Sequence, residues 1–406
     1  MRVLLVTRGF PPRGGGIGVY TRITAATMRR LGVDASVLAT HPAEPSRDDV
    51  VDGVPVFFRP FRPGADGEVG SWVERQLGAL PVEPDLIEVP DYGGFGVGND
   101  HGRVVVCSLH GCVALVNRAL GRHGADARRR ERLEGRTVAT ASALLAPTRH
   151  VLRATREVIP GAVARPGYVL PHPLDLDRWP ATEPASMAEP EVAVVGKLER
   201  LKGQDIAIRA CAVLQRRGIR VRLVLVGPSN DAADGVPYGE YLRRLAADLG
   251  VDCLVRDELV SRRDVAGYLR RARVLLVPSR WDTFPYAAVE AMAAGRPVVC
   301  GPAVGTSEML HDAGMGRLVT ATNQPDELAD ALAPLLRDAR YAAAVGRQLS
   351  DFVRTHCDAT AATRKRLDVY AALVARPALG VPSGRCAVAA APDGRPAPAL
   401  GRAQRR

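Results

Sequence analysis

Lysine is rare in this chain: of 55 basic residues only Lys197, Lys202 and Lys365 are lysines, and the other 52 are arginines. This arginine bias, together with abundant alanine, glycine and valine, is typical of a GC-rich genome rather than of a particular function. The net charge of +11 includes +5 from residues 376–406. The basic excess is therefore diffuse and argues only weakly for a nucleic-acid-binding protein.

Cysteine pairs, long apolar runs and aromatic residues are also missing or scarce. The seven cysteines are scattered without a Cys-x-x-Cys pair, which argues against a disulfide framework or zinc site and favours a reducing cytoplasm. No apolar run approaches the about 18 residues of a membrane-spanning helix. Residues 1–7 are typical of a short strand rather than a signal peptide. Aromatic residues make up only 5% of the chain, which disfavours stacking on single-stranded nucleic acid.

Apolar runs of strand length alternate with helical patterns in two successive stretches. The strands are expected at residues 2–7, 33–40, 85–89, 104–108, 146–148 and 168–170, and then at 192–195, 221–226, 252–255, 274–277, 297–300 and 317–319. Helical patterns include residues 19–30, 119–145, 326–336 and 341–374. This alternation predicts an α/β fold with two Rossmann-like, doubly wound parallel-sheet domains that face a cleft.

The same patterns divide the chain into segments. Two Rossmann-like domains are expected at residues 1–173 and 191–345, joined by a proline-containing linker without periodicity at 174–190. Helices at 346–375 are expected to pack back toward the first domain. Residues 376–406, rich in proline, glycine, alanine and arginine, are predicted to be a disordered tail.

Two of the three lysines follow one predicted strand. The run from Val192 to Gly203 has the pattern of a buried strand, a glycine turn and a helix start, and it carries both Lys197 and Lys202. A compact ammonium group beside a helix N-terminus suits a phosphate oxygen. The alternative is that both lysines lie by chance on a solvent-exposed loop.

A glycine-rich loop follows the first predicted strand. Residues 14–18, Gly-Gly-Gly-Ile-Gly, precede a helix, so backbone N–H groups there can approach an anionic ligand. The loop does not fit Gly-x-Gly-x-x-Gly in any register, which argues against a dinucleotide-binding dehydrogenase.

The segment 274–300 places two acidic residues around a helix start. A strand leads into a loop carrying Asp282, Pro285 suits the first helical position, and Glu290 lies inside the helix. Both carboxylates can therefore face a ligand at the helix N-terminus. The alternative is that Asp282 only favours the helix dipole and that Glu290 is a surface residue.

This segment resembles the signature of glycosyltransferase family 4, the retaining GT-B enzymes that use nucleotide-sugars. That signature is an acidic residue, seven residues and a glutamate, with an aromatic-Gly or aromatic-Pro pair after the first acid. Asp282 stands where glutamate is commoner, and Lys197 stands where arginine is usual. The segments that fall in family order are residues 14–18, 109–111, 146–148, 171–175, 195–198, 202–203, 282–295 and 305–308.

The resemblance implies that the nucleotide-sugar donor binds the domain at 191–345 and the acceptor binds the domain at 1–173. Lys197 and Lys202 would hold the diphosphate, and Glu290 would accept hydrogen bonds from the ribose hydroxyls. The expected catalytic residues are Asp282, His110, Lys202 and Lys197. The expected donor-binding residues are Gly15, Gly16, Lys197, Lys202, Asp282, Thr283, Phe284, Pro285, Tyr286, Ala287 and Glu290.

The family also implies a reaction. A hexosyl or N-acetylhexosaminyl group would move, with retention, from a nucleoside diphosphate sugar, in first place a UDP-sugar, to an acceptor hydroxyl. No metal or cofactor is expected, so the pair Asp175 and Asp177 is interpreted as a chance match to a metal motif. Natural-product, polysaccharide and glycolipid acceptors remain open. The alternatives are a nucleotide-sugar 2-epimerase of the same fold, a nucleic-acid-binding protein and a non-catalytic nucleotide-sugar sensor.

Acceptor recognition is expected in the first domain. Glu88 and Asp91 follow a predicted strand, and their carboxylates would suit a cationic acceptor such as an aminocyclitol. His172, between two prolines, is expected to be structural. The arginine-rich helix at 128–136 offers a peripheral membrane contact, but its glutamates and weak apolar face favour a solvated helix.

Overall fold

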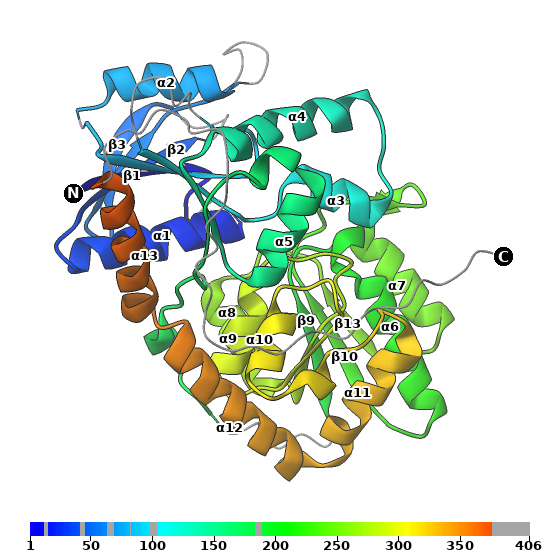
Figure 1. Cartoon of the computed structure of the whole chain (residues 1–406). Coiled ribbons are helices and arrows are strands. Elements are labelled where there is room, and N and C mark those ends of the chain that lie inside the picture. Colours follow the sequence, from blue (N-terminus) through cyan, green and yellow to red (C-terminus); the bar gives the residue numbers. More distant parts are fainter. Residues whose placement is uncertain are drawn as a thin grey trace.

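Each half of the chain folds around its own β-sheet in the computed structural model (Figure 1). The structure describes residues 1–11, 15–40, 45–62, 69–81, 83–96, 104–182 and 189–375. The first sheet contains β1 (Arg2–Arg8), β2 (Asp34–Thr40), β3 (Arg47–Val51), β4 (Val54–Phe58), β5 (Leu86–Pro90), β6 (Val104–Ser108), β7 (Ala143–Ala146) and β8 (Gly167–Val169). The second contains β9 (Glu191–Val195), β10 (Arg222–Val226), β13 (Cys253–Arg256), β14 (Val274–Val277) and β15 (Val298–Cys300). A separate short ladder joins β11 (Ala232–Ala233) to β12 (Val236–Pro237).

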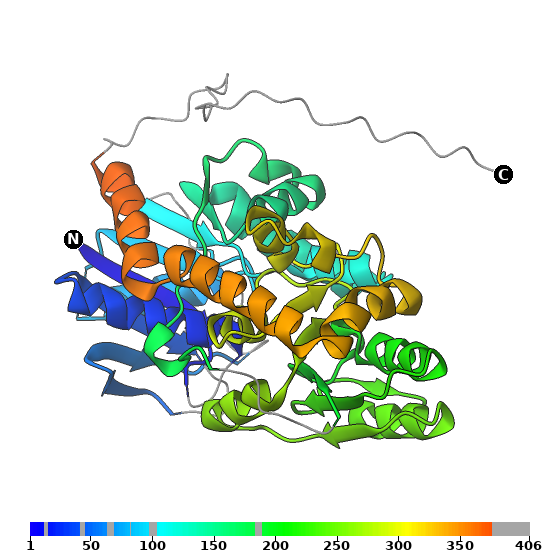
Figure 2. The same cartoon turned by 90° about the horizontal axis from the view of Figure 1, so that it is seen from below.

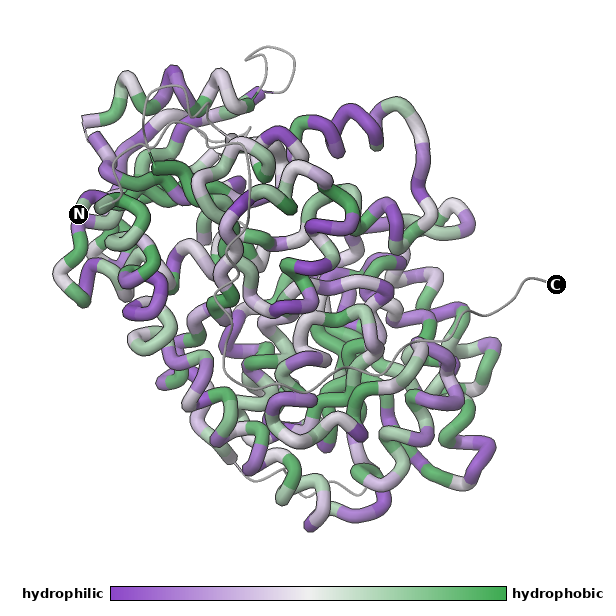
Figure 3. Tube along the Cα trace, in the orientation of Figure 1, coloured by the Kyte–Doolittle hydropathy of each residue, from purple (hydrophilic) through white to green (hydrophobic). Residues whose placement is uncertain are grey.

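Helices cover both faces of each sheet (Figures 1 and 2). The first half carries α1 (Gly16–Arg30), α2 (Val69–Ala79), α3 (Val113–Leu120), α4 (Ala125–Thr140), α5 (Arg149–Val158) and the 3₁₀ turn η1 (Pro160–Ala162). The second carries α6 (Gln204–Arg216), α7 (Tyr238–Asp248), α8 (Arg262–Arg271), α9 (Tyr286–Ala293), α10 (Thr306–Asp312), α11 (Pro325–Arg337) and the 3₁₀ turns η3 (Arg200–Lys202) and η4 (Gly316–Leu318). Figure 3 shows hydrophobic residues gathered on the central strands, as expected for parallel strands buried on both faces.

Strand order explains where a ligand site can form. The orders are β3-β4-β2-β1-β5-β6-β7-β8 and β13-β10-β9-β14-β15, and the only antiparallel pairing within these two sheets is that of β3 with β4. The direction of winding reverses between β1 and β5 in the first sheet and between β9 and β14 in the second. Loops leaving the carboxyl ends of strands at such points diverge and leave room for a ligand. The doubly wound, two-sheet prediction is confirmed.

Two C-terminal helices connect the halves along one side of the molecule (Figure 2). α12 (Ala339–His356) packs on α9, and α13 (Ala359–Val374) packs on α1. The predicted linker contains η2 (Leu176–Arg178), and its Leu174 N–H donates to the Cys357 carbonyl at 2.8 Å. Residues 183–188 of that linker and the predicted tail at 376–406 lie outside the described residues.

Four local predictions were wrong. The predicted helical pattern 119–145 covers the end of α3, a break at 121–124, the whole of α4 and most of β7. The predicted strand 317–319 is instead the 3₁₀ turn η4, with only Val319 bridging to Cys300. The predicted strand 146–148 is β7, which ends at Ala146 because Thr148 already caps α5 by accepting the Val151 N–H. The single predicted helix 341–374 is broken, since Asp358 accepts the N–H of Ala361 and starts α13 as a new helix.

The edge hairpin of β3 and β4 was missed. Asp52 and Gly53 connect the two strands, and both have positive φ angles, 53° and 75°. Asp-Gly between strand-like runs is a strong signal for this kind of turn. Residues 51–54 therefore contained a sequence signal for this hairpin.

Candidate active site between the two sheets

An ion pair joins the loops that leave the two central strands of the second sheet. Lys202, in η3 after β9, places its Nζ 2.6 Å from Asp282 Oδ2, in the loop after β14. Burial lowers the pKa of Lys202, but the Asp282 carboxylate outweighs burial and the net pKa is raised. Glycine allows this approach: a Cβ on Gly203 would lie 2.1 Å from the Pro278 carbonyl oxygen, and its φ is +70°.

Lys197 lies on the same loop with a different environment. Its side chain is exposed and makes no ion pair within the described part of the chain. Its carbonyl accepts a hydrogen bond from Gln204 Nε2 at 2.8 Å, which fixes the turn at the start of α6. The structure thus gives the two lysines distinct states, Lys202 paired with a carboxylate and Lys197 facing solvent.

Glu290 is buried inside α9 and bonds to an arginine that the sequence analysis did not select. Its carboxylate, 3% exposed as a residue, is paired with Arg262 at the start of α8. The surface-residue alternative for Glu290 is therefore wrong. The run Arg262-Arg263 gives no sequence signal for which arginine turns inward. Pro285 is the N-cap of α9, one position before the predicted place.

Two long-range approaches bring the glycine loop near α9. α1 begins at Gly16, and a Cβ there would lie 3.9 Å from Tyr286 Cδ2 at the start of α9. Gly15 is the N-cap of α1 and has no side chain to satisfy the free N–H groups of the first turn. The N-termini of α1 and α9, each with a partial positive charge, therefore lie close to each other. Gly14 lies outside the described residues.

His110 forms the opposite wall of the site. It follows β6, and its carbonyl accepts a hydrogen bond from Thr283 Oγ1 at 2.9 Å, so the loop after β14 meets the first half here. Burial, followed by the charge of Arg366, lowers the pKa of His110 to about 3. The imidazole is therefore neutral near pH 7, and it can bind a hydroxyl without adding charge.

His172 lies at the centre of an aromatic cluster that spans both halves. Its ring centroid is 4.5 Å from that of Tyr20, 4.7 Å from His110 and 4.9 Å from Phe284. Its two ring nitrogens have no hydrogen-bond partner among the described residues, and burial lowers its pKa well below the ordinary value. Packing holds this ring, in agreement with the structural role expected for it.

The acceptor hypothesis based on Glu88 and Asp91 is wrong, because both carboxylates are used internally. Asp91 is fully buried and accepts the backbone N–H groups of His110 at 2.8 Å and Gly111 at 3.1 Å. Glu88 is 3% exposed and bonds to two tyrosine hydroxyls. Neither carboxylate can reach a cationic acceptor; Asp91 instead holds the loop that carries His110.

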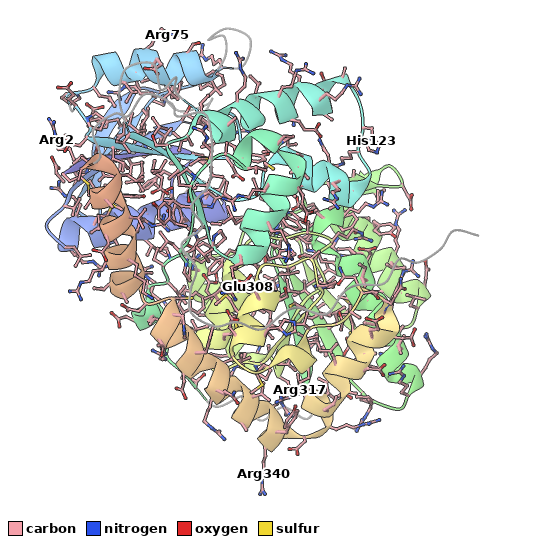
Figure 4. All side chains as sticks on the ribbon, viewed as in Figure 1. Arg2, Arg75, His123, Glu308, Arg317 and Arg340 are labelled. Atoms are coloured by element: carbon pink, nitrogen blue, oxygen red, sulfur yellow. The ribbon has the colours of Figure 1, made fainter. Side chains whose placement is uncertain are left out.

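A further contact draws the two halves together beside the site. Glu308 of α10 accepts the N–H groups of Arg149 and His150 at 3.0 and 2.8 Å, and so caps α5 of the other half. Figure 4 shows Glu308 where α5 meets the second half. Arg149 also reaches Asp312, at 2.9 Å. These contacts hold the two halves together beside the site.

Two buried carboxylates of the first half predict a pH-dependent stability. Burial raises the pKa of Asp91 to about 6 and that of Glu134 to about 8, above their values in an unfolded chain. The folded state therefore binds more protons, and the free energy of unfolding falls as pH rises through these values. Between pH 6 and 8 Glu134 adds a slope of at most about 1.4 kcal/mol per pH unit.

Urea unfolding at pH 6, 7 and 8 measures this slope. Glu134→Gln keeps the side-chain shape, and we expect it to flatten the decline between pH 6 and 8. A variant that declines as steeply as the natural chain would show that Glu134 does not titrate in this range.

Two further surveys cover only the described residues. No three His, Cys, Asp or Glu side chains there are grouped so that they could hold a metal ion. Asp175 of the Asp175-Asp177 pair bonds instead to Arg178 Nε at 2.7 Å. None of the described helices has the length and apolar character needed to cross a bilayer.

Comparison with known proteins supports one family. Residues 14–178 match the model for Glycosyltransferase Family 4, and residues 189–338 match the model for glycosyl transferases group 1. The chain is 31% identical over 355 residues to a D-inositol 3-phosphate glycosyltransferase of Nocardia farcinica, covering 80% of this chain and 77% of that protein. It is 28% identical to one of Streptomyces avermitilis, covering 88% and 79%.

Solved structures share the fold at low sequence identity. Sucrose-phosphate synthase from Thermosynechococcus elongatus has a TM-score of 0.74 at 19% identity, covering 92% of this chain and 99% of that one. Anabaena HepE, solved in complex with UDP and glucose, has a TM-score of 0.66 at 20% identity, covering 91% and 99%. The comparisons do not favour the epimerase or the nucleic-acid-binding alternative. The chain belongs to glycosyltransferase family 4 and is a glycosyltransferase with the GT-B fold.

Proposed function

We propose that this glycosyltransferase moves a hexosyl or N-acetylhexosaminyl group from a UDP-sugar to a hydroxyl of a cyclitol acceptor, with retention and without a metal. The observation that carries the proposal is the Lys202–Asp282 pair at the N-terminus of α9, opposite His110. It combines a cation for a diphosphate, an acceptor of sugar hydroxyls and a neutral imidazole in one place.

Lys202 and Lys197 would bind the diphosphate, together with the N-terminal N–H groups of α1 and α9. Their charges would act most strongly as the bond from the sugar to the diphosphate breaks, because negative charge then develops on the leaving oxygen. Glu290 would bind the ribose hydroxyls, and in doing so would exchange or share the Arg262 guanidinium that it now contacts. His110 would bind a hydroxyl of the donor sugar.

Ion pairing of the two signature carboxylates supports retention without a covalent intermediate. Asp282 is held by Lys202 and Glu290 by Arg262, so neither is a free nucleophile. In the transfer, the sugar–diphosphate bond breaks, the acceptor oxygen bonds to the same face of the sugar carbon, and the acceptor proton passes to the departing diphosphate. No metal is needed where Lys202, Lys197 and two helix N-termini compensate the diphosphate charge.

The relatives support a cyclitol as the acceptor class. The two reported above are named for D-inositol 3-phosphate. The structure no longer supports an aminocyclitol acceptor, because the carboxylates of Glu88 and Asp91 already accept hydrogen bonds inside the protein. UDP as the donor nucleotide is supported by the solved complexes of HepE with UDP and glucose and of an E. coli trehalose-6-phosphate protein with UDP-2-fluoro glucose, which share the fold.

A thermal-shift panel followed by a transfer assay tests the proposal. UDP should raise the melting temperature more than ADP or GDP, because a ligand that binds only the folded state stabilises it. UDP-glucose and UDP-N-acetylglucosamine would then be incubated with inositol 3-phosphate or inositol, and the anomeric configuration of the product determined by NMR. We expect acceptor-dependent release of UDP and an α-linked product.

Three outcomes would contradict parts of this proposal. A new nucleotide-sugar formed without acceptor would indicate an epimerase. A β-linked product from an α-linked donor would exclude retention. Activity lost to a chelator and restored by manganese or magnesium would exclude a metal-independent reaction.

A further inference from the structure

The last described helix, α13, places the charged side chain of Arg366 behind the wall of the site that the first half forms. α13 crosses to the first half (Figures 1 and 2), where Arg366 is 1% exposed and Tyr370 is fully buried. The Tyr370 hydroxyl donates to one oxygen of Glu88, the middle residue of β5. Arg366 Nη1 lies 3.7 Å from the other oxygen. These three residues come from distant parts of the chain and form one buried cluster.

Tyr20 connects this cluster to the site. Its hydroxyl donates to Glu88 and also lies 3.4 Å from Ser108 Oγ, while the Arg366 guanidinium carbon is 5.1 Å from its ring centroid. On the other side, the Tyr20 ring meets the rings of His110 at 4.7 Å and His172 at 4.5 Å. A hydrogen-bonded hydroxyl therefore fixes the ring against which both imidazoles pack.

The packing around Tyr20 leaves little free volume. The void lined by Tyr20, Glu88, Ser108 and His110 measures about 10 Å³, no more than one water molecule needs. Tyr20 is therefore held both by close packing and by its hydrogen bond to Glu88. Loss of that hydrogen bond would leave packing alone to orient the ring.

The charge of Arg366 also acts on the two imidazoles. Burial is the main cause that lowers the pKa values of His110 and His172, and the Arg366 charge adds to it in both cases. The charged or titratable groups around these imidazoles are Arg366 from α13, Glu88 from β5, Tyr20 from α1, Asp91 after β5 and Tyr286 from α9. Arg366 is a buried cation, so its charge adds to burial in favouring the neutral form of both rings.

We propose that Glu88, Arg366 and Tyr370 are positioning residues, which act through Tyr20 to fix His110 for the transfer reaction, so that α13 is part of the active-site framework. The inference rests on the proposed function for its kinetic consequence. Its structural content, a fixed arrangement of Tyr20 and the two histidines, is independent of any substrate.

The test uses substitutions that remove a hydroxyl or a charge and keep the shape. Tyr20→Phe, Tyr370→Phe and Glu88→Gln are compared with Tyr341→Phe, whose hydroxyl accepts a hydrogen bond from Arg317 on the far side of the second half. Ring ¹H–¹⁵N spectra are recorded on the full chain without ligand; its eight histidines include His110 and His172, assigned by single substitutions. Acceptor and donor kinetics are then measured separately.

Tyr20→Phe and Glu88→Gln should shift the ring signals of His110 and His172 and lower kcat about tenfold, the usual effect of losing a buried hydrogen bond to a charged group. The dissociation constant of UDP should change less than twofold, because UDP lacks the sugar that His110 would bind. Tyr341→Phe should change neither readout.

The outcomes separate the two proposals. Folded variants with unchanged histidine signals and unchanged kcat would overturn the positioning role and leave the cluster a purely structural one. A natural chain that transfers no sugar would overturn the proposed function, while the histidine spectra would still test the positioning role.

Discussion

Lys202→Ala should lower kcat by about 10²- to 10³-fold, the usual effect of removing one preorganised charge that stabilises a developing anion. In the proposed function Lys202 is the cation that binds the diphosphate; its side chain is 26% exposed, and its ammonium is already oriented by Asp282 at 2.6 Å. The orienting contact means that no reorganisation is required when the leaving group departs. Steady-state rates at saturating donor measure this effect.

The other two lysines of the chain supply the controls for this prediction. Lys365 is exposed on α13, so Lys365→Ala removes the same charge from the chain and should leave kcat unchanged. Lys197→Ala should raise the donor KM with a smaller effect on kcat, because its exposed ammonium is screened by water. Near-normal turnover in Lys202→Ala would show that the diphosphate is held elsewhere. Circular dichroism of each variant establishes that the fold is retained.

Glu88→Leu should reduce the free energy of unfolding by about 3–5 kcal/mol, the usual effect of removing one partner from a buried ion pair. The substitution leaves the Arg366 charge without its carboxylate in a site where Arg366 is 1% exposed. It also leaves the hydroxyls of Tyr20 and Tyr370 without their acceptor. Chemical denaturation followed by tryptophan fluorescence gives the measurement.

A double variant makes this second prediction sharper. Glu88→Leu with Arg366→Met removes both charges and keeps the volume, so the buried unpaired cation disappears. We therefore expect the double variant to unfold at a higher denaturant concentration than Glu88→Leu alone. Equal midpoints would mean that the lost stability comes from packing and the tyrosine hydroxyls, not from the charge of Arg366.

What the sequence allowed us to predict depends on how far apart the interacting residues lie in the chain. Lys202, Asp282 and Glu290 belong to local strand–loop–helix patterns, and their approach follows from the switch point between β9 and β14. Parallel strands were recognised from short buried runs, whereas β3 at the edge was missed because four of its five residues are exposed and three of them are charged.

The partners of these residues could not be predicted, because they depend on tertiary packing. Nothing in the run Arg262-Arg263 shows that one arginine turns toward Glu290. Glu88 lies in β5, close to the strand end where many ligand-binding carboxylates stand, and only the position of α13 shows that its oxygens are already bonded. A carboxylate at a strand end is therefore a candidate for binding only when no distant element covers it.

The return of α13 to the first sheet has a consequence for synthesis of the chain on the ribosome. Glu88 bonds to Tyr370 across 282 residues, and Tyr370 and Leu373 complete the core beside β1 and β5. Domains generally fold in order as they emerge, but here the core beside the first sheet is completed only by the last described helix. Until α13 is made, the nascent first half contains Glu88 without Tyr370 and Arg366, its partners in the folded chain. Premature termination within α13 would therefore damage the half of the protein that was made first.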